Sequence, residues 1–260
     1  MTSTIKNSYK GLFYPQDPKE LNELVSKLLS ESEVIAAKSG KLRALIVPHA
    51  GYIYSGAFAA SGYKQIGTQS YSKVILIGPS HNAYFNGLAY TSASSWENPY
   101  LKKEIDLIKP KEQGEIIIEN DMAFRQEHSV EVQLPFIAKI LPDVSLMILI
   151  AGEVPDFKQA ALELQKELTD DTLLVISSDL SHYHDYETAR EIDEQSIEQI
   201  LKLDDALNME QACGFCGINI LIELTKALGW KPQLIDKRNS GDTAGDRSQV
   251  VGYAAIAFYD

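Results

Sequence analysis

The sequence predicts an α/β fold: a single three-layer α/β/α domain over residues 1–260, with a central sheet that is mostly parallel or mixed. Two patterns favour this class. Five strand candidates are almost continuously apolar, which is typical of strands covered on both faces. Helical patterns lie between them along the chain. The 260 residues contain no repeat, low-complexity tract or linker, so we expect one domain.

The order of the expected elements follows from local signals. The first helix has Asp17 as its N-cap, Pro18 at its first position and Glu20 in its first turn. Its apolar stripe consists of Leu21, Leu24, Val25, Leu28 and Leu29. We expect strands at 42–47, 73–77, 145–150, 172–177 and 250–258, with shorter edge strands at 87–91 and 115–119. Further helices are expected near 56–66, 129–141, 157–168, 187–203 and 209–228.

Composition and charge narrow the functional classes. The chain is 45% hydrophobic and 23% charged, as in ordinary globular proteins, and its net charge of −12 argues against binding to nucleic acid or anionic lipid. The first ten residues lack the apolar core of a signal peptide, and no apolar run approaches the ~20 residues that cross a membrane. Two cysteines are too few for a secreted disulfide framework. We therefore expect a cytoplasmic protein without a membrane span.

Histidines follow three of the expected strands. His49 comes after the strand at 42–47 and His81 after the strand at 73–77, while Asp179 and His182 follow the strand at 172–177. Ligands and catalysis in open α/β sheets lie beyond the carboxyl ends of the strands. Imidazole is also the commonest metal ligand and titrates near neutral pH. This placement predicts a metal or acid–base site at one edge of the sheet.

Each of these residues also has a structural interpretation. His49 would cap a carbonyl in its turn, and Asp179 would form an Asx-turn or a helix N-cap. In the segment EHSVEVQLP, which begins at Glu127, His128 or Ser129 would cap the next helix. Glu131 suits the positive end of that helix. Capping does not explain why a second carboxylate and an imidazole lie together there, so His128 and Glu131 are candidates for the wall of a pocket.

The loop before the last strand supplies a candidate third ligand. Asp242 lies in the segment NSGDTAGD at 239–246, and two histidines with one carboxylate form the facial triad of non-haem Fe(II) sites. The alternative is a turn in which aspartates accept bonds from nearby amides. Cys213 and Cys216 have the C-x-x-C spacing of redox and zinc sites. Because they fall inside the expected helix at 209–228, burial as small structural residues is favoured.

Several familiar active-site motifs are missing from the sequence. It contains no G-x-x-x-x-G-K-[ST] phosphate loop, no G-x-G-x-x-G after a strand, no H-E-x-x-H and no G-x-S-x-G. These absences count against nucleotide, dinucleotide, zincin and serine-hydrolase functions.

Taken together, the segments resemble the Memo family, which also includes protein B of the AmmeMemoRadiSam gene set. The matching segments are GLFYP at 11–15, VPHAGY at 47–52, YSG at 54–56, GPSH at 78–81, WENP at 96–99, EHSVEVQLPF at 127–136, SSDLSH at 177–182, CG at 213–214, SGD at 240–242 and VGYAA at 251–255. Their order and their coverage of almost the whole chain carry the resemblance.

The resemblance implies a fold like that of class III extradiol ring-cleaving dioxygenases. It places His49 and His81 at metal-ligand positions and His182 at the acid–base position. Some family members have a cysteine as third ligand where this chain has Thr243, next to Asp242. A carboxylate there favours iron or manganese over Cu(I), so Fe(II) is the expected metal, with zinc, manganese or copper as alternatives. The resemblance also implies a radical-SAM partner protein.

Three functions remain open at this point. In the first, an oxidoreductase holds Fe(II) with His49, His81 and Asp242, His182 oriented by Asp179 moves a proton, and His128 with Glu131 forms the polar wall of the pocket. In the second, a hydrolase uses the same residues and zinc to activate water. In the third, a binding or scaffold protein takes a small molecule, a peptide or a partner enzyme in the same cleft.

Overall fold

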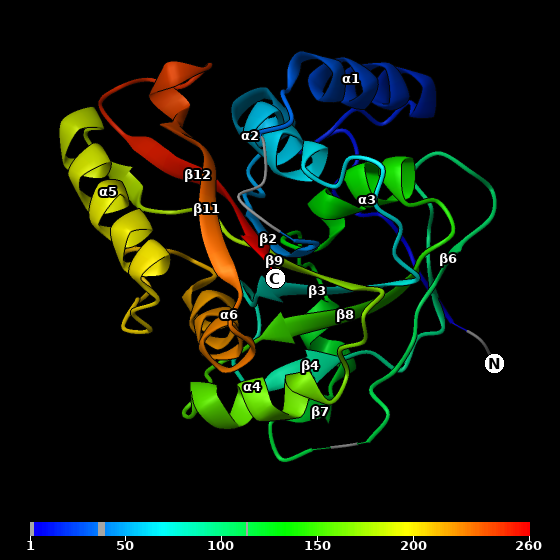
Figure 1. Cartoon of the computed structure of the whole chain (residues 1–260). Coiled ribbons are helices and arrows are strands. Elements are labelled where there is room, and N and C mark those ends of the chain that lie inside the picture. The colour runs from blue at the N-terminus through cyan, green and yellow to red at the C-terminus, as the bar shows by residue number, and fades with distance from the viewer. Residues whose placement is uncertain (1–2, 36–39, 113) are drawn as a thin grey trace.

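A nine-stranded sheet forms the centre of the computed structural model, which describes residues 3–35, 40–112 and 114–260 (Figure 1). The order along the sheet is β10-β12-β2-β9-β3-β8-β4-β7, and β11 pairs with β12 outside this path. These strands are β2 (Leu42–Val47), β3 (Lys73–Pro79), β4 (Leu88–Tyr90), β7 (Ile117–Glu119), β8 (Ser145–Ala151), β9 (Thr172–Ser177), β10 (His182–His184), β11 (Lys231–Asn239) and β12 (Val250–Tyr259). A separate three-stranded sheet consists of β1 (Thr4–Ile5), β5 (Ser95–Trp96) and β6 (Ile105–Asp106).

The four central strands run parallel, and their carboxyl ends meet at one edge. Strand β9 pairs with both β2 and β3, so that Ser177 lies beside Val47 and Ile176 beside Ile77. Antiparallel β12 and β4 flank the parallel strands. The predicted mixed α/β sheet is therefore confirmed. Strand β9 lies between β2 and β3, although these two follow one another along the chain, and both end at the same edge.

Helices cover both faces of the sheet, which explains the continuous apolar runs. Along β3, Val74 and Leu76 face one hydrophobic core while Ile75 and Ile77 face the other. The first core is closed by α1 (Pro18–Glu31), α2 (Tyr52–Lys64) and α3 (Leu134–Ile140), and the second by α4 (Phe157–Gln165), α5 (Tyr186–Lys202) and α6 (Phe215–Leu228). Figure 1 shows these two groups of helices on opposite sides of the sheet. The arrangement is the predicted three-layer α/β/α fold.

Local signals fix the helices that border the site. The side chain of Asp17 caps α1 by accepting bonds from the amides of Lys19 and Glu20, as predicted. Helix α2 lies close against β2, because a Cβ on Gly62 would stand only 2.5 Å from Cγ1 of Val47. A glycine is needed for this approach. The short turn between β2 and α2, which carries His49, is thereby held against the end of the sheet.

Some parts of the fold differ from the predictions, including β10 and the sheet of β1, β5 and β6, which were not expected. Strand β11 was not predicted, since its sequence is polar and its side chains remain half exposed at the edge of the sheet. The helix expected at 129–141 starts as a 3₁₀ turn (Glu131–Gln133) before α3. The helix expected at 209–228 begins only at Phe215, so Cys213 lies in a turn before it. Within the described ranges, none of the helices is long and apolar enough to cross a membrane.

Candidate metal centre

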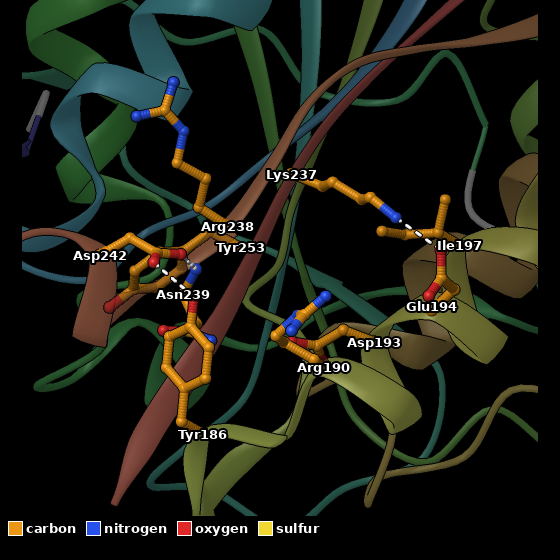
Figure 2. Close-up of a pocket in the computed structure, with 10 residues that line it drawn as sticks. All are labelled: Tyr186, Arg190, Asp193, Glu194, Ile197, Lys237, Arg238, Asn239, Asp242 and Tyr253. Atoms are coloured by element: carbon orange, nitrogen blue, oxygen red, sulfur yellow. Dashed lines mark hydrogen bonds and ion pairs between the residues drawn. The ribbon is translucent and has the colours of Figure 1, made fainter. Parts of the chain in front are cut away.

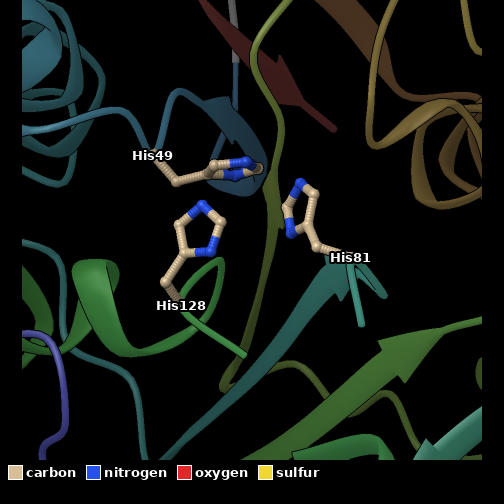
Figure 3. A group of neighbouring side chains, drawn as sticks. All are labelled: His49, His81 and His128. Atoms are coloured by element: carbon tan, nitrogen blue, oxygen red, sulfur yellow. The ribbon is translucent and has the colours of Figure 1, made fainter. Parts of the chain in front are cut away.

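Three histidine rings face one another at the carboxyl edge of the sheet (Figure 3). His49, His81 and His128 each offer a ring nitrogen, and these nitrogens all lie within 4.8 Å of one another. The ring centroids of His49 and His81 are 5.4 Å apart, and those of His81 and His128 are 4.5 Å apart. Such a spacing brings three imidazole ligands within reach of one ion.

Each ring comes from a different segment. His49 follows β2 and His81 follows β3, whereas His128 precedes the 3₁₀ turn at Glu131–Gln133. The loop that carries His128 is bound to the end of β3, because the hydroxyl of Ser129 donates to the carbonyl of Pro79 at 3.0 Å. A Cβ on Gly78 would stand 2.5 Å from this hydroxyl oxygen. Glycine at 78 therefore permits the two segments to approach.

A buried hydrogen-bond network fixes the tautomer of His49. The hydroxyl of Ser177 donates its single proton to the carbonyl of Ser129 at 2.6 Å and accepts a bond from Nε2 of Gln133 at 2.8 Å. Nδ1 of His49 lies 2.9 Å from the same oxygen and must be the donor in this contact. The lone pair of His49 is therefore on Nε2 and is available for a ligand.

Glu127 orients His81 in the same manner. Its buried carboxylate lies 2.9 Å from Nδ1 of His81 and accepts bonds from the backbone amides of His81 at 2.6 Å and Ser129 at 2.8 Å. Burial alone would raise the pKa of this carboxyl group, but the bonds from His81 and Ser129 outweigh it and hold the pKa at about 2. The carboxylate is thus ionised, and it leaves Nε2 of His81 as the free nitrogen.

The third ring is held by aromatic packing. The ring centroids of His128 and Phe13 are 4.6 Å apart, and the His128 ring stacks on His81. Burial, followed by the neighbouring histidines, lowers the pKa of His128 to about 4 and that of His49 to about 3. Both imidazoles are therefore neutral near pH 7, which is the form that binds metal ions.

A cavity of about 790 Å³ opens over the three histidines. Asp179 and His182 line it as well. Oδ1 of Asp179 accepts a bond from the amide of His49 at 2.8 Å, and Oδ2 lies 4.0 Å from Nε2 of His49. Burial raises the pKa of Asp179. The predicted edge site thus contains His49, His81, His128, Asp179 and His182, all lining one cavity.

Asp242, the predicted third ligand, lies elsewhere. Its carboxylate accepts bonds from the hydroxyl of Tyr186 at 2.7 Å and from the amide of Asn239 at 3.1 Å. Figure 2 shows it on the wall of a second cavity, which contains none of the three clustered histidines among its described lining residues. The neighbouring Thr243 donates to backbone carbonyls of Tyr54 and Ser240. Asp242 therefore caps its own turn, which is the alternative that the sequence left open.

Glu131, predicted as part of the pocket wall, instead forms hydrogen bonds with the N-terminal segment. It is buried and accepts bonds from the amides of Ser8 and Tyr9 and from the hydroxyl of Tyr14, all within 2.8 Å. These contacts tie the N-terminal segment to the loop that carries His128. The same segment places Phe13 against the ring of His128. Glu131 thus affects the histidine cluster indirectly, because it binds the N-terminal segment that carries Phe13.

Cys213 is closer to the cluster than its sequence context indicated. The residue precedes α6 instead of lying within it, and its Sγ is 3.4 Å from Nε2 of His49. Burial raises the pKa of this thiol. The thiol donates to the backbone carbonyl of Asp179, which lies 3.6 Å from Sγ. The prediction of a cysteine buried inside a helix is therefore wrong for Cys213, whereas Cys216 lies in α6 and is buried.

Comparison with known proteins decides the family. A family model described as "Memo-like protein" matches residues 6–257. The chain belongs to the Memo family. It is 39% identical over 272 residues to a MEMO1 family protein of Aquifex aeolicus, covering 95% of this chain and 96% of that protein. A MEMO1 family protein of Desulfurococcus amylolyticus is 35% identical over 280 residues, with 96% of each chain covered.

Membership in the Memo family confirms the resemblance inferred from the motifs. A solved structure of an uncharacterized protein from Escherichia coli K12 has a TM-score of 0.52 and 10% sequence identity, covering 84% of this chain and 99% of that one. At this identity the likeness extends to the fold alone.

The second cavity contains a buried acid with an unusual environment. Asp193 of α5 lines this cavity of about 460 Å³ (Figure 2). Its carboxylate accepts a bond from the amide of Ser181 at 3.0 Å. Burial raises the pKa of Asp193 to about 6, although the amide of Ser181 and the charge of His184 act in the opposite direction. The folded protein therefore holds a proton on Asp193 at pH values where the unfolded chain has lost it.

We expect Asp193→Asn to change how stability depends on pH. The raised pKa means that the wild type loses stability as pH rises from about 4 to about 6, in total about 3 kcal/mol. Asn keeps an acceptor for Ser181 without this cost. The variant should match the wild type near pH 4 and exceed it by up to about 3 kcal/mol at pH 8. Urea unfolding of both proteins from pH 4 to pH 8 measures this difference, and a difference that does not change with pH would contradict the assignment.

Proposed function

We propose that this Memo family chain is a metal-dependent oxidoreductase that holds Fe(II) with His49, His81 and His128. The observation that carries the proposal is the mutual approach of three ring nitrogens, within 4.8 Å, below a cavity of about 790 Å³. That volume suits a small organic substrate. This ligand set replaces the earlier combination of two histidines with Asp242, whose carboxylate is bound to Tyr186 and Asn239.

The donor set fits a divalent transition metal. His49 and His81 each direct an N–H at a buried acceptor, Ser177 in one case and Glu127 in the other, and keep the other nitrogen for the ion. Acceptors of this kind orient metal-binding imidazoles and raise their basicity. Two of the three rings, His49 and His128, have strongly lowered pKa values, so binding an ion requires no loss of a proton from them.

The remaining polar residues of the cavity suit proton transfer. A bound ferrous ion would supply redox and Lewis-acid chemistry for O₂ and an electron-rich substrate. Oδ1 of Asp179 is occupied by the amides of His49 and Ala50, and Oδ2 lies on the side of His49 Nε2. His182 lines the same cavity and is half-buried, so it reaches both substrate and solvent. We assign His182 the role of proton carrier and Asp179 that of its charge partner.

A second candidate is a zinc hydrolase. Three imidazoles with an open fourth position form a donor set found in catalytic zinc sites, where the ion activates water. The all-histidine cluster favours this candidate more than a set with Asp242 would. The two candidates differ in their need for oxygen.

Metal binding should depend on the histidines and not on Asp242. We expect His49→Ala, His81→Ala and His128→Ala each to weaken Fe(II) binding at least tenfold, because each removes one of three ligands. Asp242→Asn should bind as the wild type does. Anaerobic equilibrium dialysis measures the affinities, and circular dichroism verifies that each variant is folded. Loss of iron from Asp242→Asn, with iron retained in His128→Ala, would overturn the ligand assignment.

The metal and oxygen requirements separate the two candidates. The oxidoreductase should consume O₂ in the presence of an aromatic diol when loaded with Fe(II), and should lose this activity in His49→Ala or when loaded with zinc. An oxygen electrode records the uptake. Turnover of ester substrates by the zinc-loaded protein under anaerobic conditions, without O₂ uptake by the iron form, would instead establish the hydrolase.

A further inference from the structure

A smaller cavity adjoins the cavity above the histidines. It has a volume of about 300 Å³ and shares two lining residues, Met209 and Cys213, with the larger one. Sγ of Cys213 also contacts Nε2 of His49 at 3.4 Å. Met209 and Cys213 therefore form part of the wall of both cavities.

Much of the wall of the smaller cavity is apolar. Its lining includes Ala83, Phe85, Ala151 and Phe215, together with the carboxylate of Glu153. Two of its polar side chains already have partners, since the hydroxyl of Ser80 donates to the carbonyl of Ala83 at 2.7 Å and the hydroxyl of Tyr84 donates to Glu153 at 2.7 Å. A polar group entering this space would lose its hydration and find these partners occupied. The cavity thus suits a hydrocarbon group.

Exposed apolar side chains gather around the two cavities. Met209 is 72% exposed and Tyr183 is 71% exposed, and both line the cavity above the histidines. Tyr84 is 89% exposed and lines the smaller cavity. Exposed apolar groups that cluster around a concave site mark ligand-binding surfaces. Methionine in particular adapts its shape to different ligands.

The charge around the larger cavity disfavours anionic ligands. Asp179 and Asp246 line it, whereas none of its lining residues in the described part of the chain is Lys or Arg. Arg247, next to Asp246 in the sequence, is directed to the ring of Tyr186 at 4.4 Å and to the carbonyl of Gly241. The whole chain also carries a net charge of −12. A ligand with a carboxylate or phosphate away from the histidines would meet no cation there.

We propose that the substrate carries an uncharged, apolar substituent, and that this substituent occupies the smaller cavity lined by Met209 and Cys213. The inference rests on the proposed function for the position of the reacting hydroxyl groups, which lie at the histidines. It adds a subsite that selects substrates by the hydrophobicity and charge of their side chain.

Three matched catechols test the subsite by binding alone. 4-Propylcatechol and 3-(3,4-dihydroxyphenyl)propionate differ only in a terminal methyl or carboxylate group, and catechol lacks the side chain. Calorimetry with the zinc-loaded protein avoids oxidation of the probes. We expect 4-propylcatechol to bind at least about tenfold more tightly than catechol, since each buried CH₂ favours binding. The propionate should bind no more tightly than catechol.

A variant with a larger side chain in the smaller cavity tests whether the propyl group binds there. Ala83→Leu should reduce the ratio of propylcatechol to catechol affinity to about twofold or less, because the added side chain occupies the smaller cavity. Its affinity for catechol itself should stay unchanged, which shows that the histidine end is intact. The same substitution at an exposed position of α2, Ala57→Leu, serves as the control and should keep the wild-type ratio.

Propylbenzene, which has no hydroxyl groups, separates this inference from the proposed function. It should bind the metal-free wild type and not Ala83→Leu. Selective binding without O₂ uptake by the iron-loaded protein would refute the oxidoreductase and leave the subsite in place. Equal affinity for catechol and 4-propylcatechol, a propionate that matches the propyl compound, a ratio unaffected by Ala83→Leu, or no binding of any probe would each overturn the subsite.

Discussion

The register of three parallel strands is the constraint on which the site depends. Because β9 pairs with β2 on one side and β3 on the other, the residues that follow these strands begin at the same height. His49 and His81 are thereby brought together although they are 32 positions apart and their strands are not adjacent. Both faces of these strands are buried, so a shift in register would move each side chain from one core into the other and disrupt the packing of both. The stability of the two cores thus maintains the geometry of the site.

Hydrogen bonds of buried polar groups then fix the orientation and the tautomer of the histidine rings. A polar atom removed from water is costly unless it is hydrogen-bonded. Ser177, Gln133 and Glu127 are buried, and each is bound to a neighbour that lies in or next to the histidine cluster. The same bonds that compensate for burial also decide which imidazole nitrogen carries the proton. The folded protein therefore already presents these imidazole nitrogens in the form that binds a metal ion.

The sequence predicted the features that depend on neighbours along the chain or on strand periodicity. The apolar strands, the α1 cap and the histidines after β2 and β3 belong to this group. It placed His128 in the wall of the pocket but not among the ligands, because its approach to His81 requires the Glu127 carboxylate to bind the segment after β3, 46 residues away. Within the sequence around His128, only the adjacent Glu127 indicated a role in the site.

The positions of Asp242 and Cys213 depend on contacts between distant segments, which sequence patterns do not predict. Asp242 had the right residue type and a suitable loop, but the bonds it accepts from Tyr186 and Asn239 depend on the packing of α5 against the final strands. Cys213 was placed in a helix because the apolar pattern of α6 continues toward its N-terminal side, whereas the backbone turns at Gly214. There a Cβ would stand 2.6 Å from the side chain of Ser178. Such contacts between distant segments decide which side chains enter the cavity.

Anomalous diffraction from crystals loaded anaerobically with Fe(II) tests the central claim most directly. The account predicts one strong iron peak among the rings, within bonding distance of a nitrogen from each of His49, His81 and His128. Because Nδ1 of His49 is bound to Ser177 and Nδ1 of His81 to Glu127, the nitrogen that binds iron should be Nε2 in both rings. An ion bound to Asp242, or an ion bound to two of the histidines while the third ring is turned away, would contradict the account.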